Sequence, residues 1–288
     1  MSNIENGLSI GELGLAPLRE PEYVSYSAWI EHTPFAFWVV DAVRPSLFAE
    51  LGTHQGQSYM AFCQAIQSLD TSCRALAVDT WRGDEHAGFY GQEVMDALRA
   101  VHDPKYRSFS QLLQMTFTEA SLTVEDGSVD LLHIDGRHFA DDVQADFDEW
   151  LPKMSDRGVV LMHDTQVRNN GFGVHEVWAN LSQKYPSFEF HHGHGLGVLA
   201  VGSTIPERVR AFLEAGQDAD QAVWLRSFFS RLGAGVTMEY ERNLAREQER
   251  RIPELEQQVF DLSAQRVALE EQLVVQDQTG RRELTIQK

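Results

Sequence analysis

The chain has 288 residues, of which 43% are hydrophobic, and a formal net charge of −19; a chain of this size and composition can bury a full core. The negative charge disfavours nucleic acid and anionic membranes as partners, and no apolar run reaches the roughly 20 residues of a membrane span. Two cysteines are too few for a disulfide framework, and the polar start MSNIENGLSI lacks the basic segment of a secretion signal, so we expect a cytoplasmic protein.

The first predicted elements are helical and precede any strand. Residues 1–22 predict a loose arm, because they carry Gly, Glu and Pro without clear periodicity. Residues 23–43 are rich in aromatic side chains and predict two short helices divided at Pro34. Proline fits the first turn of a helix better than its interior, which places the division there.

Buried strands then alternate with helices. Strands are predicted at 47–51, 75–80, within 109–117, at 129–135 and at 158–165, and helices at 58–69, 89–102, 141–154 and 174–185. Segments 188–193 and 196–202 predict a closing antiparallel hairpin. The alternation, with strands that are continuous apolar runs, predicts an α/β fold: a doubly wound, mostly parallel, seven-stranded sheet covered on both faces.

The chain after this sheet is predicted to be helical and to divide again. A helix at 205–215 and a second helical stretch to Phe229 precede Gly233-Ala234-Gly235, which predicts a break. We divide the chain into an amino-terminal arm with helices (1–44), an α/β domain (45–203), carboxyl-terminal helices (204–235) and a tail (236–288).

The tail carries a short coiled-coil pattern. The apolar positions follow a four-three spacing, with Arg266 at one position of the seam: Leu255, Val259, Leu262, Leu269 and Leu273. Pro253 predicts a kink or a helix start. Pairing of these heptads predicts a homo-oligomer, a dimer or trimer, and the alternative is a single solvated helix.

Small and polar residues follow the first three strands. The turn Glu50-Leu51-Gly52-Thr53-His54-Gln55-Gly56-Gln57-Ser58 lets backbone approach a ligand, although its glycine spacing is not that of the dinucleotide motif and a structural turn explains it equally well. Asp79 ends the second strand, where an acid can accept both hydroxyls of a ribose. Thr116 and Phe117 follow the third strand and can border an adenine, or serve as plain cap and core residues.

Acids and histidines follow the next two strands. Asp135 and His138 come after the fourth strand, and His163 and Asp164 end the fifth. Two acids on adjacent strand ends repel each other unless a cation or a proton lies between them, and oxygen ligands suit Mg²⁺ or Mn²⁺. His138 can take a proton from a substrate hydroxyl, or be a surface residue at a helix start. His133 is interpreted as a core histidine.

The order of these motifs, ELGTHQGQS, AVDTW, VDLLHIDGRH and DFDEWLPKMSDRGVVLMHDT, resembles the class I S-adenosylmethionine-dependent methyltransferases. More narrowly, residues 45–202 are similar to the branch that O-methylates sugars and related natural products, including macrolide sugars. The resemblance implies S-adenosylmethionine as cofactor. It implies the following cofactor-binding residues: Glu50, Gly52, Thr53, Gly56, Ser58, Asp79, Thr80, Trp81, Thr116, Phe117 and Asp135.

The same resemblance implies the chemistry. Asp135 would be a metal-binding acid and His138 the catalytic base three residues later. His163-Asp164 stands where related enzymes commonly have Glu-Asp or Asp-Asn, so the metal ligands would be Asp135, His163 and Asp164. A histidine ligand favours Mn²⁺ or a softer metal over Mg²⁺.

Two loops at the strand ends are candidates for substrate recognition. Residues 81–90 are too polar and aromatic for a simple connector and predict a lid over cofactor and acceptor, with an ordinary ordered loop as the alternative. Residues 168–173 predict a second rim loop. A metal role for the histidines at 191–194 is disfavoured, because they lie in the predicted hairpin.

The leading hypothesis is therefore an O-methyltransferase of a sugar hydroxyl, in a polysaccharide or a glycosylated natural product. The acceptor would be a glycan or another small molecule, and a methyltransferase of a non-sugar molecule is one alternative. A scaffold protein that recruits partners such as glycosyltransferases through its coiled coil is another. A nicotinamide-dependent oxidoreductase is disfavoured by the glycine spacing.

Overall fold

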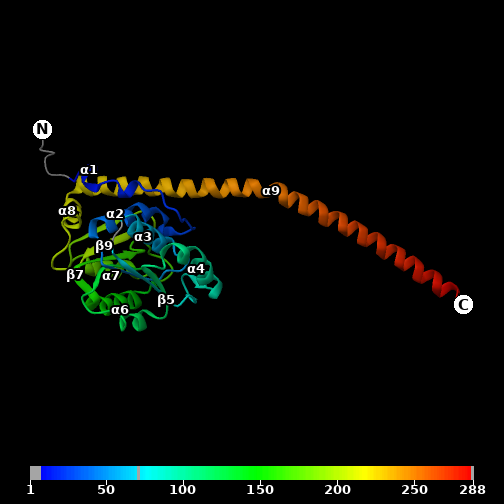
Figure 1. The fold of residues 1–288 in the computed structure, drawn as a ribbon, viewed down its shortest axis with the longest axis horizontal. Helices are drawn as coiled ribbons and strands as arrows, with labels where there is room; N and C mark the ends of the chain where they lie inside the picture. Colours follow the sequence, from blue (N-terminus) through cyan, green and yellow to red (C-terminus); the bar gives the residue numbers. More distant parts are fainter. Residues whose placement is uncertain (1–7, 70–71, 287–288) are drawn as a thin grey trace. The chain divides into compact units, whose positions relative to one another are not determined.

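The computed structural model describes residues 8–69 and 72–286, without the side chains of Ile10, Glu271 and 274–286. Residues up to Thr237 cluster into one compact unit, and those from Met238 form a second unit. The first unit is built on a seven-stranded sheet with the strand order β5-β2-β1-β6-β7-β9-β8. Figure 1 shows this sheet with helices on either side. This sheet confirms the predicted doubly wound α/β fold.

The sheet is parallel except for β9, which runs antiparallel to both of its neighbours. Its strands are β1 (Leu47–Leu51), β2 (Arg74–Asp79), β5 (Ser110–Gln114), β6 (Val129–Ile134), β7 (Met154–His163), β8 (Ser187–Phe190) and β9 (Leu196–Ala200). Every residue of β1, β6 and β9 is buried, as expected for strands that are covered on both faces. The predicted closing hairpin is β8 with β9.

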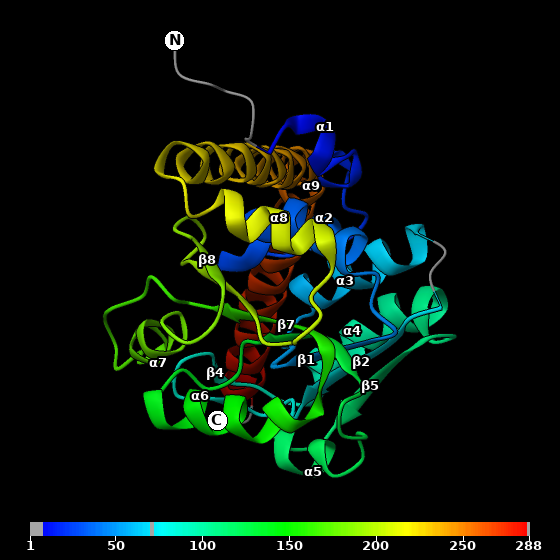
Figure 2. The same cartoon turned by 90° about the vertical axis from the view of Figure 1, so that its left-hand side faces the viewer.

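Helices cover both faces of the sheet (Figure 2). One face packs against α2 (Thr33–Val43), α3 (Gln57–Ser68), α4 (Gln92–Tyr106) and α8 (Glu207–Ala215). The other packs against α5 (Phe117–Ser121), α6 (Ala140–Trp150) and α7 (Val174–Leu181). Two hydrophobic clusters result, one on each face, which hold the strand ends at fixed positions. Among the described residues, no helix is both long and apolar enough to cross a membrane.

Residues 8–22 are more ordered than the predicted loose arm, whose first seven residues lie outside the described part of the chain. Short helical turns form at α1 (Ile10–Leu13) and η1 (Ala16–Leu18). Ser9 begins α1 and donates from both its backbone N–H and its hydroxyl to Glu12, a pairing that satisfies a helix start. The predicted division at Pro34 is confirmed: η2 (Ala28–His32) ends there and α2 carries the proline in its first turn.

The ends of several predicted helices are wrong. The helix predicted at 174–185 is α7, which ends at Leu181. Helix α4 continues past Asp103-Pro104 to Tyr106, because a proline in the last turn of a helix removes only one late hydrogen bond. Helix α9 (Ala219–Ile286) runs without a break through Gly233-Ala234-Gly235 and through Pro253. A Cβ at Gly233 would lie 2.1 Å from the carbonyl oxygen of Glu31, so this glycine permits close packing of the helix against η2.

Small elements complete the chain. A two-stranded hairpin, β3 (Gly83–Asp84) and β4 (Gly88–Phe89), follows β2. The turn η3 (Leu151–Lys153) joins α6 to β7, so the helix predicted at 141–154 ends earlier and β7 begins earlier than expected. The first turns of α9 pack in the core through Ala222, Leu225 and Phe229.

Candidate active site

A cavity of about 230 Å³ opens at the carboxyl ends of the strands. It lies where the chain order of the sheet reverses, between β1 and β6, which is where ligands bind in open α/β sheets. We call it the strand-end cavity. Seven of the predicted site residues line it: Gly52, Asp79, Thr80, Thr116, Phe117, Asp135 and His138.

The glycine turn after β1 is pressed against the end of β6. Gly52 has a φ of 87° and Gly56 a φ of 85°, a backbone region that favours glycine. A Cβ on Gly52 would lie 2.0 Å from the carbonyl oxygen of Asp135. The turn therefore needs glycine at position 52 to bring the two strand ends together.

Asp79 holds the same turn from the side of β2. One of its carboxylate oxygens accepts the backbone N–H groups of Thr53 and His54, each at 2.9 Å. The other accepts the backbone N–H of Trp81 at 2.7 Å. Carboxylate oxygens have several acceptor sites, so Asp79 can hold the turn and still offer acceptor capacity to a ligand in the strand-end cavity.

A buried hydrogen-bond chain supports the turn from below. Trp29 donates its indole N–H to Nε2 of His133 at 3.1 Å, so His133 carries its proton on Nδ1 and donates it to Glu50 at 2.9 Å. The hydroxyl of Thr53 donates to the other oxygen of Glu50 at 3.1 Å. Burial raises the pKa of Glu50, an effect that the bond from His133 opposes. Glu50 therefore positions the turn and does not line the cavity.

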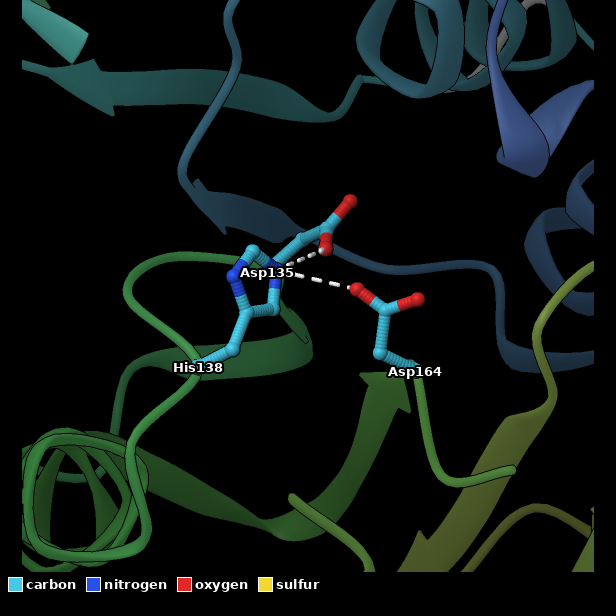
Figure 3. A group of neighbouring side chains, drawn as sticks. All are labelled: Asp135, His138 and Asp164. Atoms are coloured by element: carbon cyan, nitrogen blue, oxygen red, sulfur yellow. Dashed lines mark ion pairs between the residues drawn. The ribbon is translucent and has the colours of Figure 1, made fainter. Parts of the chain in front are cut away.

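Asp135, His138 and Asp164 converge beside the turn (Figure 3). Nε2 of His138 lies 2.9 Å from Asp164 Oδ2 and 3.6 Å from Asp135 Oδ1. Asp135 follows β6 and Asp164 follows β7, whose parallel pairing aligns the two strand ends as predicted. Asp164 has a φ of 63°, and such strain in a residue other than glycine concentrates at functional sites.

The two carboxylates hold the neighbouring histidine in its charged form. Burial would lower the pKa of His138, but hydrogen bonding and attraction from Asp135 and Asp164 outweigh it and raise this pKa to about 9. Burial would raise the pKa values of both acids, yet the neighbouring histidines, above all His163, hold these values below their usual range. His138 is consequently a proton carrier whose charge is set by two acids.

His163 lies behind Asp135 and is held on both sides. Its Nε2 is 2.9 Å from the carbonyl oxygen of Gly193, and its Nδ1 is 3.2 Å from Asp135 Oδ1. Both ring nitrogens of His163 face oxygen acceptors, so the protonated imidazolium can donate to both. Burial opposes the charge, but Asp135 and Asp164 raise the pKa of His163 well above its usual value. The hairpin histidine His194 contacts Asp164 Oδ1 at 3.1 Å.

The donor set fits a divalent cation. Asp135, His138 and Asp164 each offer one ligand atom, and these atoms lie within 4.8 Å of one another. Two carboxylates with an imidazole favour Mn²⁺ over Mg²⁺. His138 and His163 face the same carboxylates, so a bound cation would compete with the proton on His138. The predicted role of His163 as a third ligand stays a prediction.

The amino-terminal arm covers the other side of the glycine turn. Ser25, Tyr26 and Ser27 line a second cavity of about 130 Å³, together with Thr53 and Ser58; we call it the arm cavity. It shares Gly52, Asp135 and His138 with the strand-end cavity. The predicted cofactor residues Thr53 and Ser58 therefore belong to this side.

Two buried glutamines of α3 anchor the arm. Gln57 accepts the backbone N–H of Ser25 at 2.6 Å and donates to the hydroxyl of Thr33 at 3.2 Å. Two turns further along the same face, Gln64 accepts the backbone N–H of Glu22 at 2.8 Å and donates to the carbonyl of Glu20. These side-chain bonds to the backbone hold residues 20–25 against α3, beside the glycine turn. Sequence reasoning missed this wall, although its aromatic residues were a signal.

The loop at 81–90, predicted as a lid, forms part of the wall of the strand-end cavity. Gly83, Asp84 and Tyr90 line the cavity, and Tyr90 packs on the ring of His54. His86 packs edge-on to His138, with ring centroids 5.2 Å apart, and its Nε2 contacts the carbonyl oxygen of Asn170 at 3.0 Å. The two predicted rim loops therefore meet beside His138.

The remaining predicted residues divide between lining and support. Thr116 caps α5 through Glu119, and Phe117 packs against Gly136 at the cavity wall. Gly56 lies against Leu98, and the buried Trp81 donates its indole N–H to the carbonyl of His54 at 3.0 Å. Glu50, Gly56 and Trp81 thus support the turn and are absent from the cavity walls that the described residues form.

Comparison with known proteins bears on the same region. Residues 49–165 match a family described as "Methyltransferase domain". This range contains the glycine turn, Asp79 and the cluster of Asp135, His138 and Asp164.

A curated relative and two solved structures are also similar. "Uncharacterized protein y4gI" of Sinorhizobium fredii is 49% identical over 218 residues, which are 75% of this chain and 24% of that protein. The chain thus spans about a quarter of that relative's length. A methyltransferase from Geobacter sulfurreducens has a TM-score of 0.44 at 15% identity, over 58% of this chain and 76% of that one. The SAH-bound Podospora anserina methyltransferase PaMTH1 has a TM-score of 0.47 at 15% identity, over 66% and 86%.

Proposed function

We propose that this chain, whose residues 49–165 match a methyltransferase domain, is an S-adenosylmethionine-dependent O-methyltransferase that acts on a sugar hydroxyl. The observation that carries the proposal is the position of His138. It stands at the wall shared by the strand-end and arm cavities, on two acids, beside the glycine turn. In this proposal the cofactor site and the proton acceptor adjoin.

The cofactor would lie across the glycine turn. Its adenosine would occupy the strand-end cavity, where Asp79 accepts ribose hydroxyls and Phe117 borders the base. Its methionine end would enter the arm cavity beside Thr53 and Ser58. This arrangement places the sulfonium near Asp135 and His138, which line both cavities.

Methyl transfer then needs alignment and removal of one proton. The oxygen of the acceptor hydroxyl forms a bond to the methyl carbon while the bond from that carbon to sulfur breaks, and S-adenosylhomocysteine leaves as a neutral thioether. The hydroxyl proton passes to the neutral imidazole of His138, and Asp164, whose Oδ2 lies 2.9 Å from Nε2, stabilises the imidazolium that results. The pKa of His138 is about 9 in the protein without ligand, so its imidazole is mostly protonated at lower pH. His138 must lose this proton before it can act as the base.

Asp135 and Asp164 would hold a divalent cation, Mn²⁺ or Mg²⁺. His163, the third ligand predicted from the sequence, would join them only after losing the proton of its Nδ1, which faces Asp135. When bound, the cation would lower the pKa of the acceptor hydroxyl. It would also weaken the hold of the two acids on the proton of His138.

The tail would join two or more copies of the chain. The heptad residues are exposed in the described single chain, with Leu255 at 48% and Leu262 at 64% exposure. Burial of such a seam in a partner helix is the usual stabilisation of a coiled coil. A glycosyltransferase as a further partner stays a prediction.

Methyl transfer to a panel of nucleotide sugars and glycans tests the proposal. Purified protein with S-adenosylmethionine should release S-adenosylhomocysteine in the presence of a sugar acceptor. His138→Ala should abolish this release while binding of S-adenosylhomocysteine survives, and His191→Ala, an exposed hairpin variant, should retain activity. Full turnover by His138→Ala would contradict the assignment of His138 as the base. Turnover with non-sugar hydroxyl acceptors alone would contradict a sugar as the substrate.

A further inference from the structure

A third cavity lies under the loop that follows β7. It has a volume of about 520 Å³ and is lined by Gln166, Arg168, Asn169, Asn170, Phe172 and His194, among others. We call it the rim cavity. Its volume lies within the range of small-molecule sites, roughly 300 to 1,000 Å³, and the cofactor residues above have no part in its walls.

The rim cavity adjoins the catalytic cluster through two of its side chains. Phe172 stacks on the ring of His138, with centroids 4.4 Å apart and an interplanar angle of 20°. His194 contacts Asp164 Oδ1 at 3.1 Å. A molecule in this cavity is therefore one side chain away from the proton acceptor and from its acid.

Arg168 is the charged group of this cavity, and its guanidinium is held in place. Its Nη1 donates to the carbonyl oxygens of Thr165 at 2.7 Å and Val167 at 3.2 Å. No carboxylate of the described residues forms an ion pair with it. A guanidinium whose remaining N–H groups are unused matches a carboxylate or a phosphate.

The other walls suit hydroxyl groups. The amides of Asn169 and Asn170 offer both donors and acceptors, and the ring of Phe172 offers an apolar face. Two residues of this loop have a left-handed backbone, Asn170 with a φ of 55° and Gly171 with a φ of 77°, and the carbonyl oxygen of Asn170 contacts His86 of the loop at 81–90. The cavity thus combines one cation with neutral polar groups on a shaped loop.

We propose that the rim cavity binds the acceptor and that this acceptor is an anionic sugar. Its carboxylate or phosphate is held by Arg168, and a hydroxyl of the same molecule reaches past Phe172 to His138. The inference rests on the proposed function and narrows its substrate class. Arg168 is a specificity residue, since it contacts the substrate away from the reacting oxygen.

Binding of three simple sugars to the full chain saturated with S-adenosylhomocysteine tests the inference. Glucuronate carries a carboxylate, glucose 1-phosphate a phosphate, and glucose no charge. Titration followed by ligand-observed NMR should give at least one charged sugar a Kd about tenfold or more below that of glucose, the factor expected for a charge-assisted hydrogen bond. The charged sugar that binds more tightly identifies the anionic group.

Arg168→Gln should remove the preference for the charged sugar, and the matched variant Arg99→Gln, on the outer surface of α4, should keep it. The inference is overturned by glucose binding as tightly as both charged sugars, by a preference that survives in Arg168→Gln, or by no binding of either charged sugar. Calorimetry with S-adenosylhomocysteine comes first. Absence of that binding contradicts the proposed function itself, whereas its presence without an anion preference contradicts the anionic acceptor alone.

Discussion

The substitution Gly52→Ala probes the contact that joins the glycine turn to the end of β6. Gly52 has a φ of 87°, and its added Cβ would meet the carbonyl oxygen of Asp135 at 2.0 Å and Cα of Gly136 at 2.9 Å. The left-handed conformation costs a residue with a Cβ about 1–2 kcal/mol. Backbone shifts that relieve such overpacking cost about 1–3 kcal/mol more. We expect a loss of about 2–5 kcal/mol in the free energy of unfolding, and loss of S-adenosylhomocysteine binding.

Gly127→Ala is the matched control. Gly127 also has a positive φ, 71°, but no described atom lies within 4 Å of its added Cβ. Gly127→Ala should therefore lose only the conformational contribution, about 1–2 kcal/mol, in the free energy of unfolding. Urea unfolding at equilibrium measures both variants. Equal destabilisation of the two would refute the reasoning that the turn is pressed against β6.

Three further predictions follow from the same structure. Gln57→Ala removes the hydrogen-bond partner of Ser25 and Thr33, so it should weaken S-adenosylhomocysteine binding measured by calorimetry and lower the free energy of unfolding by about 1–3 kcal/mol. Gln67→Ala, at an exposed position, should change neither quantity. Unchanged binding by Gln57→Ala would show that the arm is no part of the site. Because Asp135 and Asp164 raise the pKa of His138 to about 9, kcat/KM should rise with pH up to about 9 and then level; a flat profile from pH 6 to 9 contradicts the base assignment. Removal of the residues after Thr237 should lower the oligomeric state seen by light scattering, and no change would contradict pairing through the tail.

The sheet was predictable because its strands carry their own signal. Mostly apolar runs such as 47–51 and 129–134 indicate burial on both faces, and their alternation with helices favours a parallel sheet between helix layers. The approach of Asp135 to Asp164 was predictable for the same reason, since neighbouring parallel strands end at one edge.

Features that depend on distant contacts were not predictable. Gly233 looks like a helix breaker, yet it lies inside α9 because the chain packs closely on Glu31, two hundred residues earlier. His133 is buried in the core as predicted, but its local sequence does not show that Trp29 and Glu50 make it part of the support of the glycine turn. In both cases tertiary packing decides a role that the local sequence does not show.

The arm shows the same limit at the site. Gln57 and Gln64 lie seven residues apart on one face of α3, and nothing in that spacing reveals that they bind the backbone of residues 20–25. The turn was therefore predictable as a cradle, whereas the wall that closes it was not.

Calorimetric titration of the purified chain with S-adenosylhomocysteine, and separately with NAD, tests the central claim most directly. The account predicts saturable binding of S-adenosylhomocysteine at one site per chain, weakened in Asp79→Ala, and no binding of NAD. Binding of NAD alone, or of neither compound, would contradict it.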